Sequence, residues 1–425
     1  MSFATLGLSP ALLRSVREQG YHAPTPIQSA AIPAVLGGGD VLGLAQTGSG
    51  KTAAYALPLL QRVLAARDGG PRRLRALLLL PTRELAEQVG EVLREFARVL
   101  PEPLKIAIAY GGVSINPQLM GLRGGVDIMV ATPGRLLDLV EHNALRLDTV
   151  QTLVLDEADR LLALGFAEEL QRVLDLLPAH RQNLFFSATF APAVQALADT
   201  ILREPQRIAI EATPAELPDI AQRAIQVDTA ARTPLLRHLI ATEAWPRLLV
   251  FVATKYAAEH VSDKLWKTGI KAAALHGELS QGTRRQVLAA LKANEIQVLV
   301  ATDVAARGLD IPDLPAVLNY ELPRSPADYT HRIGRTGRAG ASGVALSFIT
   351  ADTEAHFRLI EKRQGQPVPR ERITGFEPTG TGATGTGAAV GAAAIAEAAA
   401  GTGGVKGRRP SKKDKLRAAQ TQQGG

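Results

Sequence analysis

The sequence has no cysteine among its 425 residues. This absence excludes a disulfide scaffold, a thiolate zinc site, an iron–sulfur cluster and a cysteine nucleophile. The sequence also lacks any run of about 18 uninterrupted apolar residues, the length that a membrane-spanning helix needs. The first twenty residues have no basic start followed by a long apolar stretch, so they do not resemble a signal peptide. We therefore expect a soluble, cytoplasmic protein without a membrane segment.

Charge is scarce and unevenly placed. Only 21% of the residues are charged and the formal net charge is +7. Most of that charge lies in residues 406–425, which contain seven Lys or Arg residues and one Asp, so the rest of the chain is close to neutral. A basic block on a near-neutral body is typical of a nucleic-acid-binding appendage, and a solubility tail is the alternative.

The remainder of the composition suits folded α/β domains. An apolar fraction of 46% excludes wholesale disorder, and 425 residues are too many for one core. Short apolar runs such as 76–80, 152–155 and 248–253 alternate with longer helical patterns, which predicts βαβ units and parallel sheets. We predict two doubly wound parallel-sheet domains, each binding its ligand at the carboxyl ends of its strands. The expected boundaries are 1–210 for the first domain, 211–220 for a linker, 221–368 for the second domain and 369–425 for a disordered Gly/Ala-rich tail with a basic end.

A glycine-rich loop follows the predicted strand at 41–45 and opens a helical pattern. Residues Ala45–Thr52 read AQTGSGKT, in which small residues would let backbone N–H groups face phosphates. Lys51 would reach the β- and γ-phosphate oxygens, and Thr52 would offer its hydroxyl to Mg²⁺. The alternative is a glycine-rich turn with an incidental lysine, which the strand–loop–helix context disfavours.

Acidic residues end the apolar run TLVL at 152–155. The tetrapeptide DEAD begins at Asp156, and by itself it could merely cap a helix. A carboxylate at this point, Asp156, could hold Mg²⁺ through water, and Glu157 could position or deprotonate the attacking water. Together with the loop about 105 residues earlier, the pair predicts an Mg-ATP hydrolysis site of the P-loop type.

A basic, glycine-spaced segment follows a predicted strand of the second domain. Residues His331–Arg338, HRIGRTGR, carry four basic side chains in eight positions. The glycines place Arg335 and Arg338 on a compact turn suited to binding a polyanion. The residues alone leave two ligands open, a γ-phosphate across a domain cleft and an RNA phosphate.

In this order, the motifs resemble those of DEAD-box ATP-dependent RNA helicases, close to the bacterial RhlE-type subgroup. The resemblance extends over about residues 3–365, and the motif set is highly specific. The further matching segments are Phe3, Gly20–Tyr21 and Pro24–Gln28 (the adenine-reading Q motif), Pro81–Ala86, Gly111–Gly112, Thr132–Arg135, Ser187–Thr189, Leu249–Lys255, His276–Arg284 and Ala301–Ile311.

This resemblance implies tandem RecA-like domains and assigns roles to residues. The nucleotide-binding residues would be Tyr21, Gln28, Ala45, Gln46, Thr47, Gly48, Ser49, Gly50, Lys51, Thr52 and Asp310. The catalytic residues would be Lys51, Asp156, Glu157, Arg335 and Arg338, with Thr52 and Asp156 holding the metal. Asp159, Ser187, Thr189 and His331 would couple hydrolysis to RNA. The RNA backbone would be contacted by Arg83, Gly112, Thr132, Arg135, Thr254, Gln281, Arg284, Thr302 and Arg307.

The activity implied by the resemblance is RNA-stimulated ATP hydrolysis with ATP and Mg²⁺ as cofactors. Domain closure would separate short RNA duplexes or remodel RNA–protein complexes, through backbone contacts without sequence preference. Ribosomal particles and mRNA-decay complexes are candidate partners, and no membrane is expected. An ATP-gated RNA clamp needs the same motifs and stays open as an alternative. A P-loop ATPase that acts on DNA or drives transport is the third class.

Overall fold

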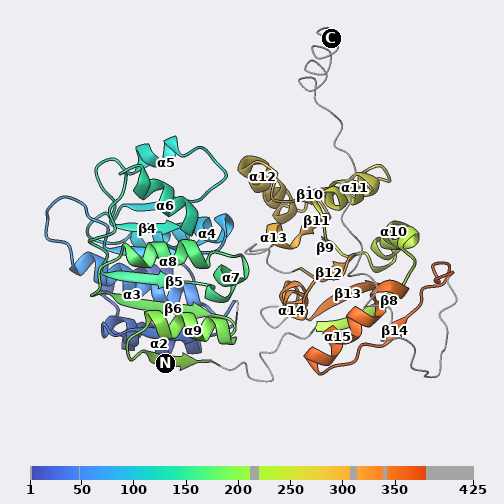
Figure 1. The fold of residues 1–425 in the computed structure, drawn as a ribbon, viewed down its shortest axis with the longest axis horizontal. Helices are drawn as coiled ribbons and strands as arrows, with labels where there is room; N and C mark the ends of the chain where they lie inside the picture. Colours follow the sequence, from blue (N-terminus) through green and yellow to red (C-terminus); the bar gives the residue numbers. More distant parts are fainter. Residues whose placement is uncertain (1, 47, 211–219, 307–313, 338–341, 380–425) are drawn as a thin grey trace, which may run out of the picture. The chain divides into compact units, whose positions relative to one another are not determined.

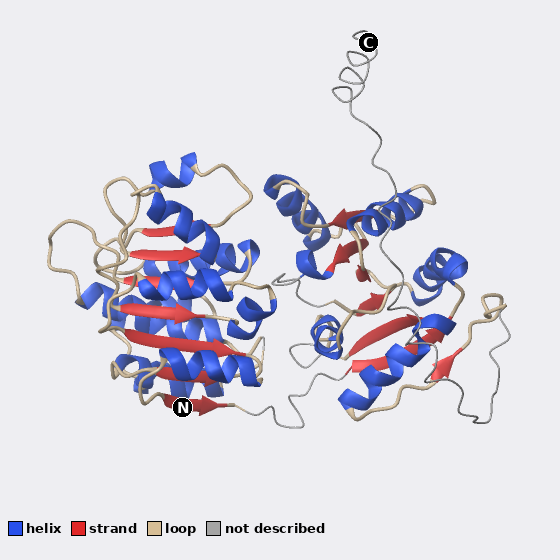
Figure 2. Cartoon of the chain, viewed as in Figure 1, coloured by secondary structure: helices blue, strands red, loops and turns tan. Residues whose placement is uncertain are grey.

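The structure is a computed structural model that describes residues 2–46, 48–210, 220–306, 314–337 and 342–379 (Figure 1). Within these residues the chain forms two parallel sheets, each with helices on both faces (Figure 2). No helix in the described ranges is both long enough and apolar enough to cross a membrane.

In the described part of the chain, the first sheet has seven parallel strands in the order β3-β4-β2-β5-β6-β1-β7. Their bounds are β1 Val41–Leu44, β2 Ala76–Leu79, β3 Ile106–Ala109, β4 Ile128–Ala131, β5 Thr152–Leu155, β6 Gln182–Ser187 and β7 Gln206–Ala209. The helices around it are α1 Pro10–Glu18, α2 Pro26–Leu36, α3 Lys51–Ala65, α4 Arg83–Ala97, α5 Asn116–Gly121, α6 Pro133–Glu141, α7 Ala158–Ala163, α8 Ala167–Asp175 and α9 Pro192–Ile201, preceded by the 3₁₀ turn η1 Phe3–Thr5.

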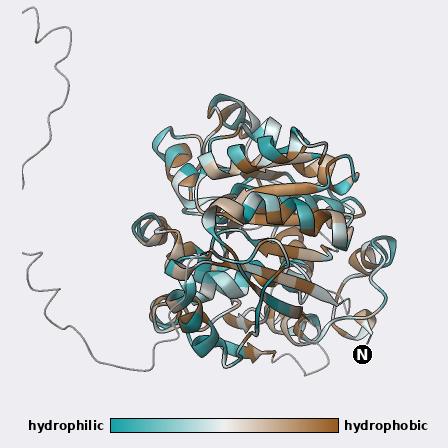
Figure 3. Ribbon diagram, turned by 90° about the vertical axis from the view of Figure 1, so that its right-hand side faces the viewer, coloured by the Kyte–Doolittle hydropathy of each residue, from teal (hydrophilic) through white to brown (hydrophobic). Residues whose placement is uncertain are grey.

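Alternate residues of these strands serve two separate cores. Phe186 of β6 belongs to the core that α1–α4 cover, whereas its neighbour Phe185 belongs to the core on the opposite face. Strands buried on both faces read as continuous apolar runs, which explains why the runs at 76–80 and 152–155 predict β2 and β5 closely. In Figure 3 the strands are coloured mainly as hydrophobic and the helices mix both colours.

The second sheet repeats the strand order of the first. Over the described residues its order is β10-β11-β9-β12-β13-β8-β14, so each strand occupies the place of the strand seven positions earlier in the chain. The bounds are β8 Ile220–Gln226, β9 Leu248–Val252, β10 Ala272–Leu275, β11 Val298–Thr302, β12 Ala316–Asn319, β13 Gly343–Ile349 and β14 Arg370–Glu371. The helices are α10 Arg232–Glu243, α11 Lys255–Trp266, α12 Gln281–Lys292, α13 Asp303–Ala306, α14 Pro326–Ile333 and α15 Glu354–Gln364, with 3₁₀ turns η2 Thr229–Ala231 and η3 Ala351–Thr353.

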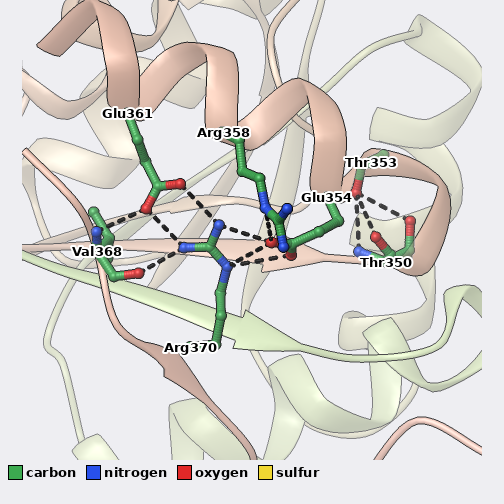
Figure 4. A network of polar contacts seen from close by, with 7 residues as sticks. All are labelled: Thr350, Thr353, Glu354, Arg358, Glu361, Val368 and Arg370. Atoms are coloured by element: carbon green, nitrogen blue, oxygen red, sulfur yellow. Dashed lines mark hydrogen bonds and ion pairs between the residues drawn. The ribbon is translucent and has the colours of Figure 1, made fainter. Parts of the chain in front are cut away.

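Two boundaries differ from the expected ones. Strand β8 already begins at Ile220, the last residue of the expected linker, and β14 lies in the stretch assigned to the tail. A strand of two charged residues carries no apolar run, so the sequence pattern does not indicate it. Ionic contacts hold it in place: Arg370 donates hydrogen bonds to Glu354 and Glu361 of α15 and to the carbonyl of Val368 (Figure 4).

The prediction of two doubly wound α/β domains is confirmed. Because all strands of each sheet are parallel, their carboxyl ends lie along one edge. In the first sheet β5, β6 and β1 are neighbours, so the segments that follow these three strands lie side by side. Those segments contain the DEAD tetrapeptide, the Ser187–Thr189 motif and the glycine-rich loop.

Candidate functional site

The glycine-rich loop joins β1 to α3. Gly48 and Gly50 have φ angles of 88° and 92°, a left-handed conformation that glycine adopts without strain. Helix α3 begins directly after the loop at Lys51, whose buried Nζ donates a hydrogen bond to the carbonyl of Ala45 at 2.6 Å. The loop therefore has the strand–turn–helix geometry of a phosphate-binding loop, with its lysine folded back onto its own backbone.

Gln28 supports this loop from α2. Its Oε1 accepts a hydrogen bond from the backbone N–H of Thr25 at 3.0 Å, which forms a capping box at the start of α2. Its Nε2 donates to the carbonyl of Gly50 at 3.2 Å, and a Cβ atom at Gly50 would lie 2.5 Å from this nitrogen. Tyr21 is half-buried and its ring packs against Phe96 at a centroid distance of 5.8 Å.

The two acidic residues after β5 are almost fully buried, each 5% exposed. Asp156 accepts hydrogen bonds from the backbone N–H of Glu157 and from the hydroxyl of Tyr55, both at 2.8 Å. Glu157 has a left-handed backbone (φ 51°) at the start of α7, and its carboxylate pairs with Arg160 at 2.7 Å. Burial raises the pKa of Glu157, and Arg160, Lys51 and Arg335 oppose that rise. A carboxyl with a raised pKa in a protected site is suited to accept a proton from water.

Three of the four residues expected to couple the site to RNA, Asp159, Ser187 and Thr189, contact one another. Ser187 ends β6 and donates a hydrogen bond to the carbonyl of Thr189 at 2.8 Å. The Thr189 hydroxyl donates in turn to the carboxylate of Asp159 at 3.0 Å. The structure thus links the DEAD tetrapeptide to the Ser187–Thr189 motif.

In the basic segment of the second domain, Arg332 differs from His331 and Arg335 in its surroundings. Arg332 is buried within that domain and donates hydrogen bonds to Asp303 and Asn319. The surroundings of His331 include residues in and directly after the DEAD tetrapeptide: burial lowers the pKa of His331, Arg160 lowers it further, and Asp159 raises it. Arg335 is 5% exposed and acts electrostatically on Glu157. Arg338 lies outside the described residues.

The expected RNA contacts divide into two groups. Arg83, at the start of α4, lies over Gly112, where a Cβ atom would overlap its guanidinium. Thr132 and Thr254 precede α6 and α11, and Thr302 ends β11, so these three lie at carboxyl ends of strands. Arg135 differs from these residues, because its side chain is buried and donates a hydrogen bond to the carbonyl of Val113 at 2.8 Å.

Gln281 and Arg284 form the second group, since both are buried against protein. Gln281 donates a hydrogen bond to Glu87 at 3.3 Å. Arg284 pairs with Glu84 at 2.6 Å and donates to the carbonyl of His276. Thr47, Arg307 and Asp310, the remaining expected site residues, lie outside the described residues.

A divalent cation fits the donor set. Among the described residues, no group of three or more His, Cys, Asp or Glu side chains could hold a metal ion by itself. Mg²⁺ is commonly held by one or two protein oxygens together with water and phosphate. The carboxylate of Asp156 and the hydroxyl of Thr52, one residue into α3, are donors of this kind.

Sequence reasoning missed two side chains of this site, Tyr55 and Arg160. Tyr55 lies one helical turn after Thr52, and Arg160 lies one turn after Glu157, so both share a helix face with a predicted site residue. That spacing was the available signal. Only the fold shows that Tyr55 reaches a carboxylate 101 positions away in the sequence.

Two family models match the chain: DEAD/DEAH box helicase over residues 25–197 and helicase conserved C-terminal domain over residues 231–340. "DEAD-box ATP-dependent RNA helicase CshA" of Bacillus cereus is 41% identical over 369 residues, 87% of this chain and 69% of the relative. The chain belongs to the DEAD-box RNA helicase family. "ATP-dependent RNA helicase DeaD" of Mycobacterium tuberculosis is also 41% identical, and the alignment covers 89% of this chain but 66% of that relative.

Solved structures of the family share the fold. Dbp5 of S. cerevisiae, described as bound to RNA and ADP BeF3, has a TM-score of 0.76 at 31% identity, covering 88% of this chain and 95% of that chain. A DEAD box protein from Methanococcus jannaschii has a TM-score of 0.51 at 36% identity, covering 87% and 99%. These similarities agree with the tandem RecA-like architecture expected from the motifs.

Proposed function

We propose that the chain is an ATP-dependent RNA helicase, which hydrolyses ATP in response to RNA and thereby separates short duplexes or remodels RNA–protein complexes. The observation that carries this proposal is the arrangement after β1, β5 and β6. There the phosphate-binding loop, a buried carboxyl with a raised pKa and the Asp159–Thr189 hydrogen bond occur together. The names of the relatives and the ligands of the Dbp5 structure support the same activity.

Nucleotide binding begins at the loop. Its backbone N–H groups would face the phosphates, and Lys51 would exchange the Ala45 carbonyl for phosphate oxygens. Gln28 would read the adenine edge with its amide, and Tyr21 would stack near the base. Asp156 and Thr52 would hold Mg²⁺, which when bound neutralises phosphate charge. Gln46, Ser49 and the remaining loop residues complete the cradle.

Hydrolysis depends on Glu157 accepting a proton from the attacking water. Its burial makes it a stronger base than an exposed carboxylate. Arg160 pairs with the same carboxylate, so that pair must loosen before the proton can be accepted. Arg335, together with Arg338, would stabilise the charge on the γ-phosphate.

RNA would be bound through its phosphates by Arg83, Gly112, Thr132, Thr254 and Thr302, with Arg135 and Arg307 as further candidates. Because these residues follow strands of both sheets, binding of ATP and RNA would together favour a closed arrangement of the two domains. We assign Arg284 and Gln281 to positioning instead, since their polar groups contact Glu84 and Glu87. Hydrolysis removes the γ-phosphate and allows the domains to separate.

The decisive experiment measures ATPase rate with RNA, with DNA and without nucleic acid, using ATP and GTP. Stimulation by RNA alone and preference for ATP support the proposal, and equal stimulation by DNA contradicts it. Unwinding of a short duplex, compared with dwell time on single-stranded RNA, separates a helicase from an ATP-gated clamp. The RhlE-type subgroup, a cytoplasmic location and ribosomal or mRNA-decay partners stay predictions from the sequence motifs.

A further inference from the structure

Tyr55 is a fully buried tyrosine inside the nucleotide-binding domain. It lies on α3, and its exposed fraction is 0%. Its ring packs against Phe186 of β6 at a centroid distance of 5.2 Å. Ring packing of this kind would be satisfied by phenylalanine, so the hydroxyl needs a separate explanation.

The hydroxyl is directed at Asp156. It donates a hydrogen bond of 2.8 Å to Oδ2, while the backbone N–H of Glu157 donates one of 2.8 Å to Oδ1. Thr52 lies one turn earlier on the same helix. The hydroxyl therefore contacts one residue that would hold Mg²⁺, Asp156, from the helix that carries the other.

Two donors, one on each oxygen, leave the Asp156 carboxylate a single orientation. Each oxygen can accept at least one further hydrogen bond, so water molecules around a cation can still reach it. Groups behind a metal ligand orient that ligand, and their loss commonly weakens metal affinity by 10- to 100-fold. Loss of the Tyr55 hydroxyl would leave Oδ2 of a buried carboxylate short of one donor.

We propose that Tyr55 is a positioning residue for the magnesium–nucleotide complex, acting through the orientation of the Asp156 carboxylate. This inference rests on the proposed function, because it requires that the loop bind a magnesium nucleotide. It extends that function by giving the affinity for the metal a determinant outside the recognised motifs.

The test is Tyr55→Phe, which keeps the ring and removes the hydroxyl. We expect the Mg²⁺ concentration for half-maximal binding of a fluorescent ADP analogue, without RNA, to rise about tenfold. Binding of the same analogue in excess EDTA should match the parent. An unchanged Mg²⁺ half-saturation in a folded variant overturns the proposal.

Tyr329→Phe is the matched control. Tyr329 is 1% exposed, and its hydroxyl donates to Gln222 in the second domain, away from Asp156. The Tyr329→Phe substitution should lower the melting temperature about as much as Tyr55→Phe does and leave the Mg²⁺ concentration for half-maximal binding unchanged. An equal shift in both variants would mean a general loss of stability, and the proposal would fall.

A donor-retaining replacement gives a second measurement. Tyr55→p-aminophenylalanine substitutes an N–H donor for the hydroxyl and should restore the parent's Mg²⁺ half-saturation, even if the phenylalanine variant does not fold. A tenfold rise with this replacement contradicts the proposal. If the parent chain itself shows no magnesium-dependent nucleotide binding, the proposed function fails, and that result differs from a parent that binds while Tyr55→Phe binds equally well.

Discussion

Glu157 combines a buried side chain, a left-handed backbone and an ion pair with Arg160. Non-glycine residues in this backbone region often belong to functional sites, where the surrounding structure enforces the conformation. The neighbouring Asp156 follows β5 directly, and its carboxylate accepts hydrogen bonds from the Tyr55 hydroxyl and the Glu157 backbone N–H. The two adjacent carboxylates therefore have different surroundings, which suit Asp156 to bind Mg²⁺ and Glu157 to accept a proton from water.

Glu157→Gln should retain nucleotide and RNA binding and lose turnover by about 10²- to 10⁴-fold, because the attacking water loses its base. Steady-state ATPase rates at saturating RNA, combined with a nucleotide titration, measure both quantities. Lys51→Ala serves as the contrasting variant, in which nucleotide affinity itself should fall. Parent-level turnover by Glu157→Gln would assign the base to another residue.

Arg160 opposes the effect of burial on the pKa of Glu157. Burial raises the pKa of Glu157 and Arg160 lowers it, so Arg160→Gln should raise that pKa further. A base is active only above its pKa, and the acidic limb of the kcat profile should therefore move to higher pH. The profile is measured at saturating ATP and RNA. A limb that stays in place or moves to lower pH would show that this pair does not control the base.

At the scale of elements, β14 shows how a strand can form without an apolar run. Its residue Glu371 pairs with Arg223 of β8 at 2.8 Å, and Arg370 bridges Glu354 and Glu361 of α15 (Figure 4). The Arg370 guanidinium also lies 4.8 Å from the ring centroid of Phe357. These contacts complete the second sheet in the place that β7 occupies in the first.

Arg370→Ala should lower the free energy of unfolding by about 1–2 kcal/mol, since the variant loses partly buried charge-assisted hydrogen bonds. Arg358→Ala is the control, because Arg358 is largely exposed and contacts the same Glu354, so its loss should cost less than about 0.5 kcal/mol. Urea denaturation measures both. Equal effects would show that the Arg370 network does not stabilise β14.

The same network predicts a pH dependence. Hydrogen bonds from Arg370 hold the pKa of Glu361 below its usual value. A lowered carboxyl pKa contributes stability above the unfolded-state value, and this contribution is lost as the pH falls through the folded-state value. The stability difference between parent and Arg370→Ala should accordingly narrow below about pH 4.

At the scale of the molecule, the described fold extends beyond the expected end of the second domain. Thr379 donates hydrogen bonds to Asp228, and Phe376 packs against His238 at a centroid distance of 5.3 Å. A truncation intended to remove only the basic block should therefore end after residue 379. The earlier boundary of 368 would remove β14 with it.

Truncation after Thr379 should leave a folded, RNA-stimulated ATPase with weaker RNA affinity. If half of the seven basic residues meet phosphates, the slope of log K against log salt should flatten by about 2–3. RNA titrations at salt concentrations between about 50 and 200 mM measure this slope for the full chain and for the truncated one. A slope equal to that of the full chain would make residues 380–425 a passive extension.

The sequence determined the two-domain α/β fold, strands such as those expected at 41–45, 76–80, 152–155 and 248–253, and the identity of the loop and acidic motifs. Continuous apolar runs bounded by polar residues are a local signal, and motif spacing reports the order of the strands along the chain. The tertiary structure alone decided which distant side chains meet: Tyr55 with Asp156, Arg83 over Gly112, Arg370 with α15. Such contacts depend on the lateral orders β5-β6-β1, β3-β4-β2 and β13-β8-β14, because a sheet brings together strands that are far apart in the chain.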